Sequence, residues 1–163
     1  MTEKEVTVPL KAGDVAPAFC LPDKDNQNVC LNDFTGMWVV LYFYPRDNTS
    51  GCTREALDFS AALDDLKRLN AVVLGVSADS VESHRKFVAK HHLSVRLLSD
   101  VEHQVLAQYG AWQLKQLYGK EFWGTVRSTV LIAPDGVIAH IWPKVQVKGH
   151  VEAVKQQLEE LQT

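Results

Sequence analysis

The sequence is poor in cysteine, and it lacks a hydrophobic run long enough to cross a membrane. Its 163 residues include three cysteines, which are Cys20, Cys30 and Cys52. Such a small, odd number is a poor match to a secreted disulfide scaffold, so we interpret them as reactive or buried thiols. The longest apolar run is far below the ~20 residues of a membrane span, and residues 1–14 lack the pattern of an export signal. We therefore expect a cytoplasmic protein with no membrane partner.

An excess of positive charge is also missing. The 17 lysines and arginines face 20 aspartates and glutamates, which gives a net charge of −3, so we expect no nucleic-acid partner. Neither the G-x-x-x-x-G-K-[ST] nor the G-x-G-x-x-G pattern of nucleotide-binding loops occurs. The six histidines show no ligand spacing with cysteine or acidic residues. We predict no metal site and no cofactor, and we expect the histidines at the surface or at helix ends.

What is present is an alternation of strand-like and helix-like segments. Residues 38–44, WVVLYFY, and residues 71–78, AVVLGVSA, are apolar enough for strands covered on both faces. Between them, residues 53–69 repeat apolar positions at helical spacing, which predicts an amphipathic helix. Because no repeat or linker divides the chain, we predict a single domain over residues 1–163.

The remaining segments complete an α/β fold. They predict a short hairpin formed by AFCL and NVCL, a helix that begins after a capping signal at Asp79 and Glu82, a strand in VRLLSD, a helix that ends near Tyr109, a hairpin around PDG and a final helix over residues 149–162. We expect a thioredoxin-like fold, with a central mixed β-sheet sandwiched by helices and an N-terminal β-hairpin. Residues 111–126 are interpreted as a long irregular connection.

Cys52 lies where a predicted strand gives way to a helix. In the first helical turn, free N–H groups and the positive end of the helix dipole favour the reactive thiolate over the thiol. Thr49 could direct its hydroxyl at the sulfur, and Pro45 would form a rigid wall that limits water. A cation for a leaving oxygen could come from Arg46, Arg54 or Arg127. The alternative is that Cys52 is a small, buried hydrophobic residue.

Several motifs resemble one known family. PRDNTSGCTREA resembles the P-x-x-x-T-x-x-C motif of peroxiredoxins, in the form found in the bacterioferritin comigratory protein, or peroxiredoxin Q, subfamily. LKAGDVAPAFCLPDKDNQNVCLNDFTG is similar to the opening hairpin of this subfamily, YGKEFWGTVRSTVLIAPDG to its arginine-bearing strand and IWPKVQVKGHVEAV to its last strand and helix. The resemblance spans nearly the whole chain.

The resemblance implies a thiol peroxidase that reduces hydrogen peroxide and organic hydroperoxides without a cofactor. Cys52 would be the peroxidatic nucleophile, cycling through a sulfenic acid, while Thr49 hydrogen-bonds the peroxide and Pro45 shields the site. Arg127 would favour the thiolate and stabilise developing charge, and Glu55 would orient the arginine. The alternative for Glu55 is a solvated acid that the helix dipole favours.

Other side chains near the motif have less defined roles. We interpret Arg46 and Arg54 as surface charges. Three aromatic residues of the long connection either pack it down, which we favour, or form an apolar rim suited to organic hydroperoxides; they are Trp112, Phe122 and Trp123.

The chain departs from the family pattern in its cysteines. Many members carry a resolving cysteine five residues after the first, where this chain has Leu57, and no cysteine follows Cys52. We expect a one-cysteine enzyme whose sulfenic acid is reduced by thioredoxin, glutaredoxin or another external thiol. Alternatively, Cys20 or Cys30 is the resolving cysteine, or Cys52 pairs with another chain. Cys20 and Cys30 could also form a disulfide across the hairpin, although we favour simple packing for both.

Two other functions are compatible with the predicted fold. A disulfide reductase normally uses C-x-x-C, and Thr49 stands where the first cysteine would be. A thiol redox sensor or holdase, which is oxidised once without turnover, remains an alternative because the resolving position is Leu57. The resemblance favours a monomer.

Overall fold

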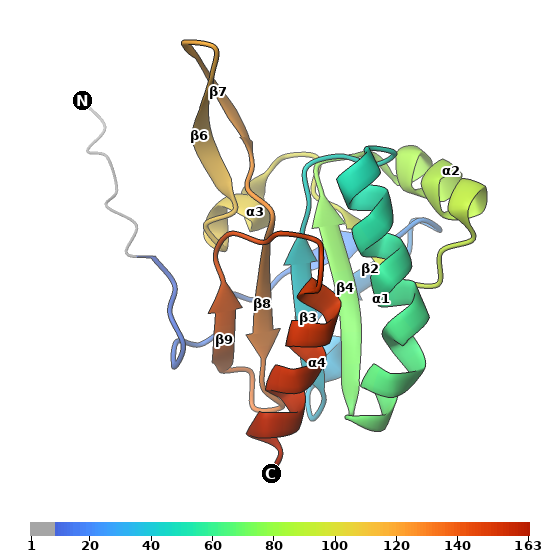
Figure 1. The fold of residues 1–163 in the computed structure, drawn as a ribbon, viewed down its shortest axis with the longest axis vertical. Helices are drawn as coiled ribbons and strands as arrows, with labels where there is room; N and C mark the ends of the chain where they lie inside the picture. The colour runs from blue at the N-terminus through green and yellow to red at the C-terminus, as the bar shows by residue number, and fades with distance from the viewer. Residues whose placement is uncertain (1–8) are drawn as a thin grey trace.

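A five-stranded mixed sheet forms the centre of the computed structural model, which describes residues 9–163 (Figure 1). The strand order is β5-β4-β3-β8-β9. The strands β3 (Trp38–Phe43), β4 (Ala71–Ser77) and β5 (Arg96–Ser99) run parallel, and the antiparallel strands β8 (Ser128–Ile132) and β9 (Ile138–Trp142) extend the sheet. Residues 1–8 lie outside the described residues, and they include most of the segment in which we expected no export signal and the start of the predicted domain.

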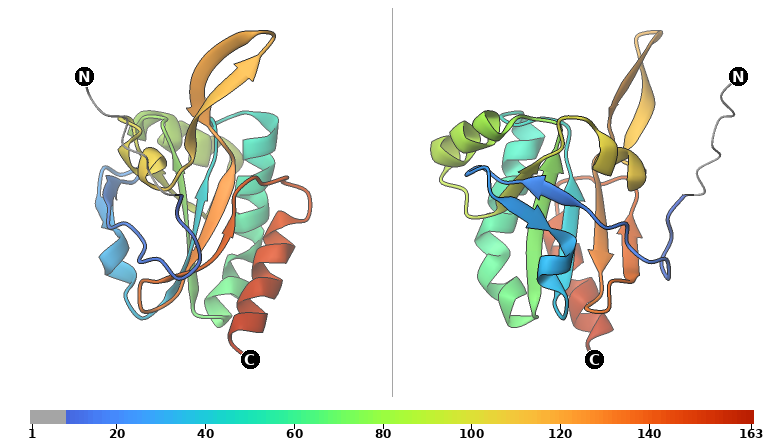
Figure 2. Two further views of the ribbon diagram at one scale, coloured as in Figure 1. Left: turned by 90° about the vertical axis from the view of Figure 1, so that its left-hand side faces the viewer. Right: turned by 180° about the vertical axis from the view of Figure 1, so that it is seen from behind.

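Different elements cover the two faces of this sheet (Figures 1 and 2). One face packs against the helices α1 (Ser50–Arg68), α2 (Val81–His91) and α4 (His150–Leu161). The other face packs against the hairpin of β1 (Cys20–Pro22) and β2 (Asn28–Cys30), the short helix η1 (Leu31–Phe34) and α3 (Gln104–Gln108). The predicted fold, a mixed sheet between helices with an N-terminal hairpin, is confirmed.

Strand β3 contributes to both layers. Val39 and Leu41 pack in the cluster on the hairpin side, whereas Val40 and Tyr42 pack on the helix side together with Cys52. Successive side chains of a strand point to opposite faces, so a segment that is apolar at every position is buried on both. Full burial of each such side chain contributes about 1.5–3 kcal/mol to folding.

Helix α1 begins at Ser50, three residues before the predicted start. Its buried stripe includes Ala56, Phe59 and Leu66, which recur at helical spacing and pack on the sheet. Cys52 lies within the first turn of the helix, as expected. No helix in the described part of the chain is long and apolar enough to span a membrane.

The prediction of an irregular connection over residues 111–126 was wrong. These residues form a protruding hairpin of β6 (Trp112–Leu117) and β7 (Lys120–Thr125), which rises above the sheet in Figure 1. Its two-residue turn has positive φ at both Tyr118 (53°) and Gly119 (76°). Such turns usually carry asparagine, aspartate or glycine at the first position, and the tyrosine there hid the signal.

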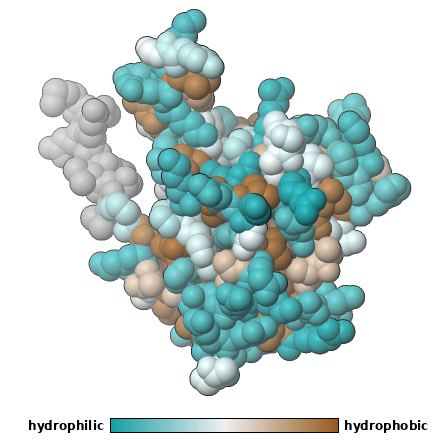
Figure 3. Space-filling model, viewed as in Figure 1, coloured by the Kyte–Doolittle hydropathy of each residue, from teal (hydrophilic) through white to brown (hydrophobic). Residues whose placement is uncertain are grey.

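The hairpin leaves apolar side chains in contact with solvent. Phe122 is 44% exposed and Trp123 is 60% exposed, so the interpretation that they pack the segment down was wrong for both. Apolar side chains are visible among the polar ones on this hairpin in the space-filling view (Figure 3). Trp112, in contrast, is half-buried, and its ring stacks on the His103 ring with the two ring centroids 3.9 Å apart.

The start of α2 also differs from the prediction. Ser80 is the N-cap, and its hydroxyl accepts a hydrogen bond from the Ser83 N–H. The carboxylate of Asp79 instead accepts from the Ser77 hydroxyl and from the backbone N–H of Asp47. Asp79 therefore joins the end of β4 to the loop before α1.

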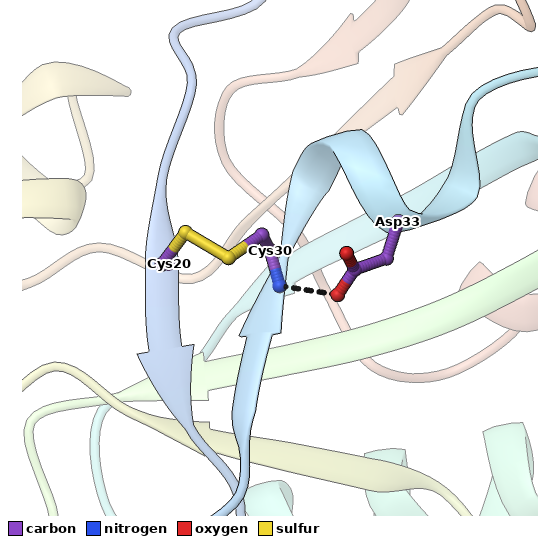
Figure 4. Close-up of a disulfide and its surroundings, with 3 residues drawn as sticks. All are labelled: Cys20, Cys30 and Asp33. Atoms are coloured by element: carbon purple, nitrogen blue, oxygen red, sulfur yellow. Dashed lines mark hydrogen bonds between the residues drawn. A yellow bond between two sulfur atoms is a disulfide. The ribbon is translucent and has the colours of Figure 1, made fainter.

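Cys20 and Cys30 form a disulfide, so the interpretation that both simply pack was wrong (Figure 4). They are directly opposite each other in the antiparallel pair, with Cα atoms 4.0 Å apart. The Cys30 N–H donates to the Asp33 carboxylate at the start of η1, as Figure 4 shows. Cross-linking two residues at a sequence separation of 10 stabilises a fold by about 2–3 kcal/mol in the chain-entropy model.

A glycine in β4 makes room for a buried tyrosine. A Cβ atom at Gly75 would lie 2.6 Å from Tyr42 Cζ and 2.8 Å from Leu97 Cδ2. We predict that Gly75→Ala lowers the free energy of unfolding by about 1–3 kcal/mol, because the buried ring cannot move aside without strain.

Urea denaturation measures this loss. Gly124→Ala is the control, because its Cβ would meet the flexible Lys115 side chain at 3.3 Å, and we expect a change below about 0.5 kcal/mol. Equal effects of the two substitutions would contradict the packing argument.

Candidate active site

The strand order brings two distant segments together at one end of the sheet. Strand β3 leads into the loop of residues 45–49, which ends at the first turn of α1. Strand β8 runs antiparallel to β3 with Ser128 opposite Phe43, so Arg127, the residue just before β8, lies beside the end of β3. The pairing register therefore carries the arginine to the start of α1.

Cys52 is the third residue of α1, and it is 1% exposed. It is the free thiol of the three cysteines. The N–H groups of the first helical turn have no partner within the helix, and they favour a negative charge there. Arg127 adds a full charge, because its Nη2 donates a hydrogen bond to Cys52 Sγ at 3.2 Å. Both features place positive charge beside the sulfur.

Glu55 binds the other terminal nitrogen of the Arg127 guanidinium. Arg127 Nη1 donates to Glu55 Oε1 at 2.6 Å, and the glutamate is fully buried one helical turn after Cys52. The alternative of a solvated first-turn acid was therefore wrong. The two contacts orient the planar guanidinium, because one arm is bound to the carboxylate and the other to the sulfur.

Burial and charge act against each other in this ion pair. Burial raises the pKa of Glu55 to about 7, although the neighbouring Arg127 charge and hydrogen bond lower it. Burial works in the opposite direction on Arg127, but Glu55 and Cys52 outweigh it and raise the pKa of the guanidinium above its ordinary value. Arg127 therefore keeps its charge beside the sulfur.

Gly51 leaves space for the arginine. A Cβ atom at this position would lie 3.2 Å from Arg127 Nη2, closer than side chains normally approach. A cleft of about 510 Å³ borders Gly51 between the start of α1 and residues 147–149. Cys52 does not line this cleft, and its side chain is buried.

Thr49 and Pro45 lie in the exposed loop before α1, and Thr49 is the N-cap residue of this helix. The Thr49 hydroxyl donates to the backbone carbonyl of Arg46 at 2.9 Å. Within residues 9–163, no hydrogen bond joins this hydroxyl to Cys52. The Thr49 oxygen therefore keeps its acceptor capacity for a small molecule in the site.

The other two nearby arginines are surface charges, as predicted. Arg46 is exposed, and Arg54 points outward from α1 to an ion pair with Asp58 at 3.1 Å. Arg127 is thus the arginine that the structure brings to the sulfur.

Sequence reasoning missed a buried polar network behind the loop. Asp47 is 6% exposed and His84 is fully buried, and their side chains are in contact at 2.7 Å. The expectation that histidines lie at the surface was wrong for His84, which shares the apolar face of α2 with Phe87. That helical spacing was the signal available in the sequence.

A second histidine is buried near Arg127. His150 Nε2 lies 2.8 Å from Thr129 Oγ1, and its ring packs edge-on against Phe59 and Trp142. Burial, with a smaller contribution from Arg127, lowers the pKa of His150 to about 4. It is therefore neutral at physiological pH.

One cluster has the spacing of a metal site. Ligand atoms of Asp47, Asp79 and His84 lie within 4.8 Å of one another. Protein donors already occupy the two carboxylates, and the imidazole nitrogens are already in hydrogen-bonding contact. The donor set therefore fits an internal hydrogen-bond network better than a metal ion.

Comparisons with known proteins agree with this geometry. Residues 12–141 match the model of the AhpC/TSA family. The chain is 43% identical to peroxiredoxin Bcp of Bacillus subtilis and also 43% identical to peroxiredoxin Bcp of Escherichia coli, each over 93% of this chain and 97% of the relative.

Solved structures show the same likeness. The Xanthomonas campestris bacterioferritin comigratory protein superposes with a TM-score of 0.85 at 38% identity, covering 89% of this chain and 92% of that chain. A peroxiredoxin Q variant from Xylella fastidiosa superposes with a TM-score of 0.90 at 35% identity, covering 96% of this chain and 99% of that chain. The predicted fold and family are confirmed.

The Glu55 environment predicts a pH-dependent contribution to stability. The pKa of the carboxyl is raised from 4.5 to about 7 in the folded protein. A raised folded pKa contributes stability that is fully present below the unfolded value of 4.5 and is lost as pH rises through about 7. We predict that the free energy of unfolding of the wild type, minus that of Glu55→Gln, decreases between about pH 5 and about pH 8.

Urea denaturation at several pH values measures this difference. Glu82→Gln is the control, because its side chain is 71% exposed and we expect no such trend. A difference that increases with pH would instead mean that the ion pair with Arg127 outweighs the cost of burial.

Proposed function

This chain belongs to the AhpC/TSA family as a peroxiredoxin of the Bcp, or peroxiredoxin Q, type, and we propose that Cys52 is the thiol with which it reduces peroxides. Membership makes the protein a thiol peroxidase, with a peroxide substrate and a thiol reductant. The observation that carries the assignment to Cys52 is the Arg127 guanidinium, which donates to this sulfur while Glu55 holds it in place.

The proposed first step is a displacement at the peroxide O–O bond. The Cys52 thiolate attacks the hydroxyl oxygen of the peroxide, and the O–O bond breaks. The second oxygen leaves as hydroxide or alkoxide and takes a proton from solvent to become water or an alcohol. The sulfur is oxidised to a sulfenic acid, and the peroxide is reduced by two electrons. In this proposal, Arg127 stabilises the negative charge that develops on the oxygens, because its Nη2 already lies 3.2 Å from the sulfur.

The loop residues have supporting roles in this proposal. The Thr49 oxygen accepts a hydrogen bond from the peroxide hydroxyl, since its own proton is donated to the Arg46 carbonyl. Pro45 lacks an N–H group and limits water at the mouth of the site. Glu55 positions Arg127 without touching the substrate.

For the reductive half of the cycle, we propose an external thiol, such as thioredoxin, glutaredoxin or a small thiol. The position of the common resolving cysteine is Leu57, which is 40% exposed and inert. Cys20 and Cys30 are bonded to each other on a hairpin that packs against the opposite face of the sheet from Cys52. These observations favour a one-cysteine cycle over resolution within the chain.

A sensor or holdase that is oxidised once remains the alternative. The two functions differ in turnover, because an enzyme consumes peroxide repeatedly when a reductant is present. We favour the enzyme because the relatives carry the name peroxiredoxin and the arginine and glutamate are built around the sulfur.

We predict that Cys52→Ser lowers peroxide consumption in the presence of thioredoxin or dithiothreitol by at least about 1000-fold, because a serine hydroxyl is not ionised at neutral pH. The assay follows peroxide loss over many equivalents per protein. The double variant Cys20→Ser/Cys30→Ser is the control, and it should keep the first oxidation rate. Rapid consumption by Cys52→Ser would refute the assignment, and a single equivalent consumed by the wild type would favour the sensor.

We predict that one equivalent of hydrogen peroxide removes one thiol, that of Cys52, and leaves a sulfenic acid that dimedone traps. Intact mass and peptide mapping locate the change, starting from protein with the Cys20–Cys30 disulfide and from fully reduced protein. A disulfide from Cys52 to Cys20 or Cys30 would contradict the one-cysteine cycle. A disulfide between two Cys52 residues would indicate pairing of two chains.

A further inference from the structure

The loop between β3 and α1 is held at its midpoint by a buried carboxylate. Asp47 stands two residues from Pro45 and two from Thr49, and it is 6% exposed although both neighbours are exposed. Its side chain thus turns inward from a loop that otherwise faces solvent. Burial of a charged group costs free energy unless the group is paired and hydrogen-bonded. The partners of Asp47 must therefore offset this cost.

Three side chains contact the Asp47 carboxylate. The Tyr44 hydroxyl donates to Oδ1 at 2.7 Å, the Ser83 hydroxyl donates to Oδ2 at 2.8 Å, and His84 Nδ1 lies 2.7 Å from Oδ2. The backbone N–H of Asp47 donates to Asp79 at 2.8 Å. The loop is therefore tied to the end of β3, to the segment after β4 and to α2 at once.

The two ring nitrogens of His84 have different partners. Its Nε2 faces the backbone carbonyl of Leu98 at 3.0 Å, and a carbonyl can only accept, so Nε2 carries a proton. Its Nδ1 faces the Asp47 carboxylate at 2.7 Å. The imidazole therefore links the loop, through Asp47, to the backbone of β5 at Leu98.

We propose that His84, acting through Asp47, positions the loop of residues 45–49 so that the Thr49 hydroxyl and the Pro45 ring meet the peroxide at Cys52. His84 is a positioning residue, because it touches neither the sulfur nor the substrate side of the loop. This inference rests on the proposed function of Cys52 and adds a residue from outside the P-x-x-x-T-x-x-C motif.

The ends of the loop explain why one anchor is enough. Strand β3 holds the loop at Tyr44 through its backbone bond to Val76, and α1 holds it from Ser50 onward. Between these ends, Asn48 has a positive φ of 63° and the Thr49 hydroxyl bonds to Arg46, so the chain turns sharply. Release of Asp47 would free the middle of this turn while α1, Arg127 and the thiolate stay in place.

The test separates peroxide chemistry from thiolate reactivity. Two rate constants are measured for Cys52, one with hydrogen peroxide and one with iodoacetamide, which needs the thiolate but not the peroxide contacts. In His84→Gln, one amide cannot donate to both Asp47 and Leu98, and we expect the ratio of peroxide rate to alkylation rate to fall by about 10-fold or more. Ser83→Ala, which removes one of the donors to Asp47 and leaves the others in place, should lower the ratio by about 3-fold.

Two controls lie on the same helix. His91→Gln alters a half-buried histidine without contact to the loop, and Phe87→Leu loosens the packing of α2 without a hydrogen bond to Asp47. Both should keep the wild-type ratio, and Phe87→Leu should do so even when its melting temperature falls as far as that of His84→Gln.

The outcomes are distinguishable. An unchanged ratio in His84→Gln and Ser83→Ala, or an equal fall in Phe87→Leu at matched stability, would overturn the inference while leaving the function of Cys52 intact. If His84→Gln fails to fold, the Ser83→Ala ratio decides alone. A wild-type Cys52 that is alkylated but does not react with peroxide would overturn the proposed function and this inference together.

Discussion

The Arg127 guanidinium, held between Glu55 and Cys52, is the interaction on which the site depends. One nitrogen is bound to a fully buried carboxylate and the other to the sulfur. In the proposed reaction, the donor is already in place to stabilise the negative charge that develops on the peroxide oxygen. Burial disfavours the charged form of Glu55 and raises the pKa of its carboxyl to about 7. Gly51 is part of the same constraint, since a larger residue would crowd the arginine.

The central sheet separates the free thiol of Cys52 from the Cys20–Cys30 disulfide. Cys52 packs with the helices on one face, while Leu21 and Val29, the inward neighbours of the disulfide cysteines, pack on the other. Side chains alternate along a strand, so Cys20 and Cys30 point away from the sheet. The disulfide therefore fastens the N-terminal hairpin on the face of the sheet opposite Cys52.

Several features were accessible from the sequence because their signals are local. The all-apolar segment that became β3, the amphipathic stripe of α1 and the motif around Cys52 all lie within short windows. The hairpin of residues 112–125 was missed because Tyr118 occupies a turn position that usually carries asparagine or glycine. The burial of His84 had a local signal in its spacing from Phe87, but its contact with Asp47 had none, because the two residues are 37 positions apart. The disulfide was considered but not favoured, although the symmetry of the hairpin about its turn was visible in the sequence.

The sequence by itself determined the family and the layered α/β fold, because periodicity and motif spacing are properties of neighbouring residues. It also indicated which arginine and glutamate belong to the site through the resemblance. Only the tertiary structure decided that Glu55 is buried, that Cys20 and Cys30 are bonded, and that Asp47 is fastened to α2. Each of these depends on the register of strands or on burial between elements far apart in the chain, and such contacts form only when the sheet assembles.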